Sequence, residues 1–209
     1  MKINEIFYSI NGEGKWTGRP NIFIRTTGCN LRCSYCDTKY AYDSGEEMKI
    51  EEILKEISQY PCKYICITGG EPLLQNEIIN LIDALIEKNY KICIETNGSK
   101  NINEISKNKS LMISLDIKCP SSDMHDKNLL KNIALLNEKD QLKFIIKNNE
   151  DYNYAKKIIE DYKPACDVFF QPVWGSDPVK LADWIINDKL NVKLGLQLHK
   201  ILWGESKGI

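Results

Sequence analysis

The stretch "IFIRTTGCNLRCSYC", residues 22–36, places three cysteines directly after a short apolar run. Residues 22–26 are mostly bulky or β-branched and predict a β-strand. Cys29, Cys33 and Cys36 follow, and no second cysteine or histidine pair comes at the spacing of a structural zinc site. The fold therefore includes a strand that ends in a cysteine loop.

The composition of the chain indicates a globular protein. Of its 209 residues 43% are hydrophobic and 27% are charged, with no low-complexity block or long linker, so we expect a single domain over residues 1–209. The formal net charge is -1 and the lysines are interspersed with acidic residues. This pattern argues against nucleic acid or a membrane as a partner and favours a small polar ligand.

The cysteines and the N-terminal segment bear on the compartment. No stretch approaches the roughly 20 apolar residues of a transmembrane helix, and residues 1–14 lack the apolar region of a signal peptide. We therefore expect a cytoplasmic protein with its eight cysteines reduced, so that clustered cysteines point to metal binding or catalysis. Cys62, Cys66 and Cys93 lie in or beside apolar runs and are interpreted as core residues.

Short apolar runs alternate with amphipathic segments along the chain. The predicted strands are residues 22–26, 64–68, 91–95, 112–117, 142–146, 168–170 and 192–198. The predicted helices are residues 49–60, 75–89, 126–138, 151–162 and 178–189. This alternation predicts an α/β fold of parallel βαβ units, wound as an open sheet or curved into a barrel.

Polar segments follow the predicted strands at their carboxyl ends. Besides the cysteine loop they are "TGGEP" (68–72), "ETNG" (95–98), "DIKCPSS" (116–122), "QPVWG" (171–175) and "QLHK" (197–200). Ligands bind at this edge in parallel α/β folds, because the loops vary while the strands hold them rigidly. One composite site is therefore expected.

The three clustered cysteines fit two kinds of metal site. Structural zinc normally takes four ligands and would need a distant one, such as Cys119 or His199. A [4Fe–4S] cluster is also usually held by four cysteines, so three leave one iron open for a substrate or cofactor. The spacing favours the cluster over zinc, and unligated core thiols are a third possibility.

A second pattern strengthens the cluster interpretation. Cys-x3-Cys-x2-Cys with Tyr35 before the last cysteine, followed by "TGGEP", resembles the radical S-adenosylmethionine superfamily. The resemblance implies a reduced or partial (β/α) barrel with mostly parallel strands. It also implies a [4Fe–4S] cluster on Cys29, Cys33 and Cys36, with S-adenosylmethionine on the open iron. Gly70 and Glu71 would contact its methionyl group, Glu71 as an acceptor for the ammonium. Alone, "GGEP" would indicate a turn before a helix.

The flanking stretches narrow the resemblance. "SINGEGKWTGRPNIFIRTTGCNLRCSYCDTKYA" (9–41), "SLDIKCPSS" (114–122), "QPVWG" and "LQLHKILWGESKGI" (196–209) are similar to the 7-carboxy-7-deazaguanine synthase family, from about residue 5 onward. The family converts 6-carboxy-5,6,7,8-tetrahydropterin to 7-carboxy-7-deazaguanine by a 5'-deoxyadenosyl-radical ring contraction that releases ammonia, on the route to 7-deazapurine nucleosides. The resemblance implies a homodimer, an external one-electron reductant and Mg2+.

The same resemblance implies roles for individual residues. Those assigned to substrate are Ile10, Asn11, Gly12, Glu13, Arg25, Thr68 and His199, with Asn11 where the family often has glutamine. Those assigned to S-adenosylmethionine, besides Gly70 and Glu71, are Asp116, Ile117, Lys118, Gln171, Pro172, Val173 and Trp174. Thr38 corresponds to the single protein ligand of Mg2+. The tail extends beyond that of members whose terminal carboxylate meets substrate, so no contact is expected of Ile209.

Arg25 can also be judged from its position alone. A guanidinium at the end of an apolar strand needs a partner, and its planar fork suits the substrate carboxylate. A structural salt bridge is the alternative.

Two other functions fit parts of the sequence. An activase of glycyl-radical enzymes would share the cysteine loop but act on a protein, and the "NGEG" and "QLHK" segments argue against it. A zinc or electron-carrier module would not need "GGEP".

Overall fold

The computed structural model describes residues 1–206 and 208. Within them one sheet has the strand order β3-β1-β2-β4-β5-β6-β7-β8-β9. From β2 through β9 in this order neighbouring strands pair in parallel, while β1 is antiparallel to both β2 and β3. The strands are β1 Lys2–Ile10, β2 Pro20–Thr26, β3 Glu46–Glu47, β4 Tyr64–Gly69, β5 Lys91–Thr96, β6 Leu111–Ile117, β7 Gln141–Ile146, β8 Asp167–Pro172 and β9 Lys193–Leu194.

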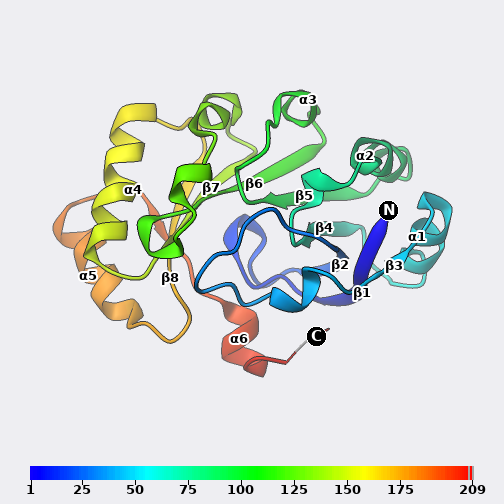
Figure 1. Cartoon of the computed structure of the whole chain (residues 1–209), viewed down its shortest axis with the longest axis horizontal. Helices are drawn as coiled ribbons and strands as arrows, with labels where there is room; N and C mark the ends of the chain where they lie inside the picture. Colours follow the sequence, from blue (N-terminus) through cyan, green and yellow to red (C-terminus); the bar gives the residue numbers. More distant parts are fainter. Residues whose placement is uncertain (207, 209) are drawn as a thin grey trace.

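The helices lie mainly on one side of this curved sheet. The α-helices are α1 Ile50–Ile57, α2 Ile78–Glu87, α3 Asn103–Ser106, α4 Asn149–Tyr162, α5 Pro178–Asn187 and α6 Leu198–Trp203. Figure 1 shows α1 to α5 in an arc along the outer side of the sheet, with α6 at the opposite, inner side. β3 and β9 are the sheet edges, so the barrel is partial, and the predicted α/β class is confirmed. Among the described residues no helix has the length and apolar character needed to cross a membrane.

The core explains the apolar runs. Ile65, Cys66 and Ile67 in β4 are all fully buried, as expected for a parallel strand covered on both faces. Ile53 and Ile57, one turn apart in α1, are also fully buried. The predicted core position of Cys66 is thereby confirmed.

The sequence prediction missed the first strand and misjudged one helix. β1 was not predicted, because polar residues interrupt its apolar pattern. Residues 126–138 were expected to be helical but contain two 3-10 helices, His125–Lys127 and Leu130–Leu135. The break falls at Asn128, whose side chain accepts from Lys118 N at 2.9 Å and donates to Lys118 O at 2.8 Å. Asn128 thus braces the chain after β6.

The strand predicted over residues 192–198 is largely wrong. β9 ends at Leu194 and α6 begins at Leu198. Gly195 N donates to Phe170 O at 2.8 Å, and a Cβ at Gly195 would lie 3.1 Å from Gln171 Oε1. The chain leaves the sheet where it passes close to Gln171, and α6 then crosses toward the site.

Candidate active site

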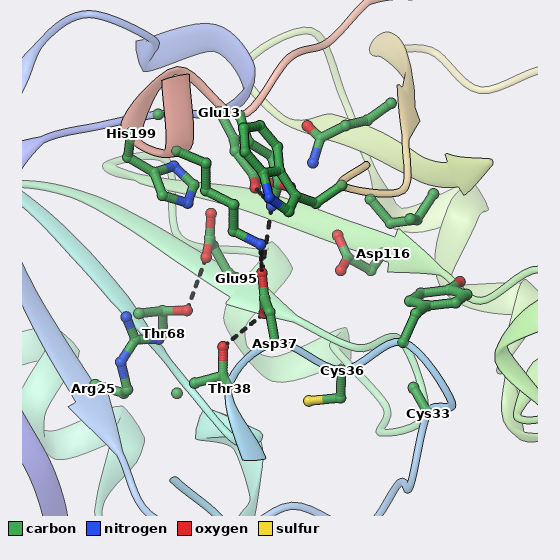
Figure 2. A pocket seen from close by; sticks show the side chains of 18 of the residues that line it. Glu13, Arg25, Cys33, Cys36, Asp37, Thr38, Thr68, Glu95, Asp116 and His199 are labelled. Carbon is green, nitrogen blue, oxygen red and sulfur yellow. Dashed lines mark hydrogen bonds and ion pairs between the residues drawn. The ribbon is translucent and has the colours of Figure 1, made fainter. Parts of the chain in front are cut away.

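A cavity of about 710 Å³ is lined by residues from the carboxyl ends of the parallel strands and from α6. In Figure 2 the cysteine loop lies below this cavity and Glu13 and His199 lie above it. The predicted site residues in its lining are Ile10, Asn11, Gly12, Glu13, Arg25, Cys29, Cys33, Cys36, Thr38, Thr68, Gly70, Asp116, Lys118, Gln171, Pro172, Val173, Trp174 and His199. The polar segments therefore meet in one site, as expected. The described lining does not include Glu71 or Ile117.

The cysteine loop is held by main-chain contacts. Gly28 N donates to Ala41 O at 2.8 Å before the loop, and Ser34 N donates to Ser122 O at 3.0 Å within it. Cys29, Cys33 and Cys36 are free and half-buried. Burial raises the pKa of the Cys29 thiol, and the hydrogen bond from Leu31 N to Cys29 Sγ, at 3.4 Å, opposes this rise. The loop thus presents three thiols to the cavity without a disulfide.

The donor set fits a cluster better than a single ion. Across the residues that the structure describes, no three His, Cys, Asp or Glu side chains converge on one metal position. Cys119, a candidate fourth zinc ligand, is fully buried and directs its thiol to Ile117 O at 3.9 Å. A [4Fe–4S] cluster binds each cysteine to a different iron, so it does not require the thiols to meet at one point.

Gly70 is required where two loops touch. A Cβ at Gly70 would lie 2.0 Å from Gly28 O and 3.0 Å from Cys29 Cβ. Gly70 N donates to Thr26 O at 3.2 Å and Glu71 N donates to Gly28 O at 2.8 Å. The glycine therefore lets the "TGGEP" loop pack directly on the backbone that carries the first cysteine.

Glu71 does not face the cavity, contrary to the expectation that its carboxylate meets an ammonium. It is fully buried, and its two oxygens accept from Leu73 N at 3.0 Å, Thr96 Oγ1 at 2.8 Å and Asn97 N at 2.7 Å. Burial raises the pKa of this carboxyl although the three hydrogen bonds oppose the rise. Glu71 therefore ties its own loop to the loop after β5.

In the segment at the end of β6 expected to bind S-adenosylmethionine, residues 116–118, neighbouring side chains face opposite sides of the sheet. Asp116 points to the cavity, whereas Ile117 is fully buried in the core, because successive side chains in a strand face opposite sides. The Ile117 side chain therefore cannot contact a ligand there. Among the residues that line the cavity, Tyr35 OH and Gln171 Oε1 are buried without a hydrogen-bond partner in the described residues. Buried polar atoms are normally paired, so these two fit a bound polar ligand.

The loop after β1 contacts the start of α6 on one side of the cavity. Leu198 N donates to Gly12 O at 3.0 Å, and a Cβ at Gly12 would lie 2.0 Å from His199 Nδ1. His199 belongs to the first turn of α6, and not to a strand end as expected. Burial lowers its pKa, against the attraction of Glu13.

Arg25 and Thr68 lie side by side on paired strands. Arg25 Nε donates to Glu5 Oε1 at 2.7 Å, so the predicted salt bridge exists, yet Arg25 also lines the cavity. Thr68 Oγ1 donates to Glu95 Oε2 at 2.8 Å. Figure 2 shows Arg25 and Thr68 on the same side of the pocket.

Thr38 has a carboxylate beside it. Its hydroxyl donates to Asp37 Oδ1 at 2.9 Å, and Lys200 Nζ of α6 contacts Asp37 Oδ2 at 2.5 Å. Burial alone would raise the pKa of Asp37, but the contact with Lys200 and the hydrogen bonds from Thr38 and Gln197 together outweigh burial and bring it to about 2. α6 is thus fastened to the segment that follows the cysteines. Ile209 lies outside the described residues.

Comparison with known proteins agrees with this geometry. The sequence model of the radical SAM superfamily matches residues 23–172. A 7-carboxy-7-deazaguanine synthase of Thermoplasma acidophilum is 36% identical over the full length of both chains. The chain belongs to this synthase family. A relative of the same name from Methanospirillum hungatei is 40% identical, over 97% of this chain and 85% of its own.

A solved structure agrees with the family assignment. The crystal structure of QueE from Escherichia coli superposes with a TM-score of 0.78 at 25% identity, covering 95% of this chain and 94% of that one. The radical SAM family implies a [4Fe–4S] cluster and S-adenosylmethionine, which agrees with the three thiols and the unpaired polar atoms of the cavity.

This synthase-family site contains a charged group that the sequence analysis missed. Lys143 Nζ contacts Glu13 Oε2 at 2.6 Å and Asp116 Oδ1 at 3.3 Å. Lys118 Nζ contacts Asp116 Oδ2 at 2.9 Å. Lys143 lies between Leu142 and Phe144 in a predicted strand, so strand alternation alone places it on the opposite face from these two core residues. That alternation was the signal that could have found it.

Glu95 was expected in the composite site only as part of "ETNG", with no role of its own. It lines the cavity and accepts a hydrogen bond from the Thr68 hydroxyl, while the neighbouring carboxylates Glu13 and Asp116 both reach Lys143. Burial raises the pKa of Glu95, against the attraction of Lys143. For Glu13 burial also favours the neutral form, but contact with Lys143 prevails and lowers its pKa.

Proposed function

We propose that this chain converts 6-carboxy-5,6,7,8-tetrahydropterin to 7-carboxy-7-deazaguanine with release of ammonia, on the pathway to 7-deazapurine nucleosides. The observation that carries the proposal is one cavity that joins the cysteine and "TGGEP" loops to residues 10–13, Arg25 and His199. The first two belong to any radical SAM enzyme. The others match the synthase family, to which the chain belongs along its full length.

Different residues of the chain would bind the cluster and S-adenosylmethionine. Cys29, Cys33 and Cys36 would hold the cluster, and the wall with Asp116 and Gln171 would hold S-adenosylmethionine. When bound, these groups supply the electron and the carbon radical that start the ring contraction. The protein contributes position and exclusion of water.

A second group of lining residues suits the pterin. Arg25 offers a planar fork to the substrate carboxylate. Glu13, which Lys143 keeps ionised, presents an acceptor to the donors of the aminopyrimidinone ring. The loop of residues 10–12 provides a flat edge beside His199. These contacts would fix the ring with its carboxylate toward Arg25.

We also propose that Mg2+ binds beside Thr38. The support is a hydroxyl and the Asp37 carboxylate, 2.9 Å apart, in the cavity wall. Oxygen ligands suit Mg2+, which keeps several waters and often takes few protein ligands. Substrate oxygens would complete its shell.

Three further features are proposed on the resemblance alone: a homodimer, a cytoplasmic location and an external one-electron reductant. Light scattering of the purified chain tests the first, and a monomeric mass would exclude it. Cell fractionation tests the second. Turnover with reduced flavodoxin in place of dithionite tests the third.

The activity is tested by anaerobic incubation of the reconstituted protein with dithionite, S-adenosylmethionine and 6-carboxytetrahydropterin, with and without Mg2+. We expect 7-carboxy-7-deazaguanine and ammonia by mass analysis, no product from Cys33→Ala, and weaker Mg2+ stimulation in Thr38→Ala. A fully reconstituted cluster with no product would contradict the proposed activity. Identical Mg2+ curves for Thr38→Ala and the unmodified protein would contradict the Mg2+ assignment alone.

A further inference from the structure

A β-bulge sits at the start of the strand that faces Arg25. Ile3 pairs with Thr26 and Glu5 pairs with Arg25, so Asn4 is an extra residue in β1. Asn4 Nδ2 donates to Ser44 O at 2.8 Å, which holds the extra residue in place. With regular pairing Asn4, and not Glu5, would stand opposite Arg25. The bulge thus re-aims the Glu5 side chain to the face that carries Arg25.

Glu5 binds the Arg25 guanidinium through one nitrogen, Nε. Glu5 Oε1 accepts from Arg25 Nε at 2.7 Å and from Tyr40 OH at 2.9 Å. The Arg25 guanidinium carbon also lies 5.8 Å from the ring centre of Phe7 and 5.7 Å from that of Tyr40. Because the bond to Glu5 uses Nε, the two terminal nitrogens remain the fork that can grip a carboxylate in the cavity.

Glu5 is not in the described cavity lining, whereas Arg25 and Tyr40 are. Glu5 thus contacts two lining side chains, and its other oxygen lies 3.6 Å from the position that a Cβ on Gly208 would take. Tyr40 lies two positions after Thr38, so the same carboxylate oxygen is bonded to both the arginine and the segment that carries Thr38.

We infer that Glu5 is a positioning residue that aims the Arg25 fork at the substrate carboxylate. The inference rests on the proposed function, since it takes the carboxylate of a 6-carboxypterin as the group that Arg25 binds. The chain would then recognise the 6-carboxyl through a series of contacts. The bulge orients the Glu5 side chain, Glu5 orients the Arg25 guanidinium, and Tyr40 connects Glu5 to the segment that carries Thr38.

The test uses binding, which does not depend on turnover. On the reconstituted enzyme with S-adenosylmethionine, the Kd values of oxidised 6-carboxypterin and of pterin without the carboxyl are measured by fluorescence. Their ratio reports carboxylate recognition. We expect Glu5→Gln to weaken 6-carboxypterin binding about tenfold, in line with loss of a charge-assisted hydrogen bond, and to leave pterin binding unchanged. Tyr40→Phe should have a smaller effect of the same kind.

A double-mutant cycle shows whether Glu5 acts through Arg25. Arg25→Met should abolish the preference for the carboxylate, and adding Glu5→Gln should change nothing further. If Arg25→Met keeps the preference, the role given to Arg25 in the proposed function fails. If Arg25→Met loses it but Glu5→Gln alone keeps it, the positioning inference is overturned while the proposed function stands. Equal weakening of both pterins by Glu5→Gln would likewise overturn the inference, because it indicates a structural role.

Asp188 provides a matched control. Its carboxylate also accepts from a tyrosine, Tyr152 OH at 3.0 Å, and pairs with a cation, Lys156, but it lies at the end of α5 and outside the described cavity lining. Asp188→Asn removes the same kind of charge and should alter neither Kd. A change in the carboxylate ratio here would show that the assay responds to general destabilisation and would overturn the inference.

Discussion

The two walls of the cavity are held in different ways. The cysteine wall, residues 28–36, 69–71 and 96–98, depends largely on main-chain atoms: Gly70 packs on Gly28, and the Glu71 carboxylate bonds to the backbone of residues 73 and 97. The charged wall comprises Glu13, Asp37, Asp116, Lys118, Lys143, Gln197 and Lys200, and its contacts join side chains. A single substitution in the cysteine wall should therefore cost more stability than one in the charged wall, because main-chain atoms cannot rearrange as side chains can.

Gly70→Ala should have the largest effect, because it acts on the cysteine wall. The added Cβ would lie 2.0 Å from a main-chain oxygen of Gly28, and backbone cannot move aside as a flexible side chain can. We expect loss of cluster incorporation and a stability loss of about 3 kcal/mol or more. The measurements are iron content after reconstitution and the thermal midpoint.

Gly18→Ala is the control for Gly70→Ala. Gly18 has φ +83, but no atom of the described chain lies within 4 Å of the position that its Cβ would take. The variant therefore reports backbone strain without a clash, about 1 kcal/mol. Full iron content and an unchanged midpoint in Gly70→Ala would show that the two loops are not held by close packing.

Lys143→Met should come next, since it acts on the charged wall. The Lys143 side chain is 6% exposed and contacts both Glu13 and Asp116. Removing it leaves two poorly solvated carboxylates without their shared cation, which costs about 3 kcal/mol when a buried ion pair is broken. Adding Glu13→Gln should restore part of the loss in urea unfolding. Lys193→Met is the control: it breaks an exposed pair with Asp167 and should cost at most about 1 kcal/mol. Equal losses of stability in Lys143→Met and Lys193→Met would show that Lys143 contributes no more than a surface lysine.

The sequence predicted the cysteine wall better than the charged wall, for a physical reason. Cys29, Cys33 and Cys36 are neighbours along the chain and "TGGEP" is itself one continuous stretch, so each pattern can be read from local spacing. Lys143 meets Glu13 only after β7 has been placed beside the loop from β1, and β1 itself was missed.

Side-chain direction was the other limit. Residues 68–70 line the cavity, but the orientation of Glu71 is set by amide donors at Leu73 and Asn97, which spacing alone does not reveal. Residues 192–198 predict a strand because their alternation is regular, yet Gly195 turns the chain out of the sheet toward Gln171 and makes α6 possible.

Glu95→Gln should have the smallest effect and should depend on pH. Burial raises the pKa of Glu95 above its ordinary 4.5, against the pull of Lys143 and with the help of nearby Glu13 and Asp116. A carboxyl whose pKa is higher in the folded state stabilises the fold below its unfolded pKa, and that contribution is lost as the pH rises through the folded pKa. Glutamine does not ionise and can still accept from Thr68 Oγ1, so Glu95→Gln should gain thermal stability relative to the unmodified protein as the pH is raised from about 5 to about 8. The exposed Glu160→Gln, on α4, corrects for the general effect of pH. If the difference in thermal midpoint between Glu95→Gln and the unmodified protein is the same at both pH values, the prediction is wrong and Glu95 is as easily ionised as a surface carboxyl.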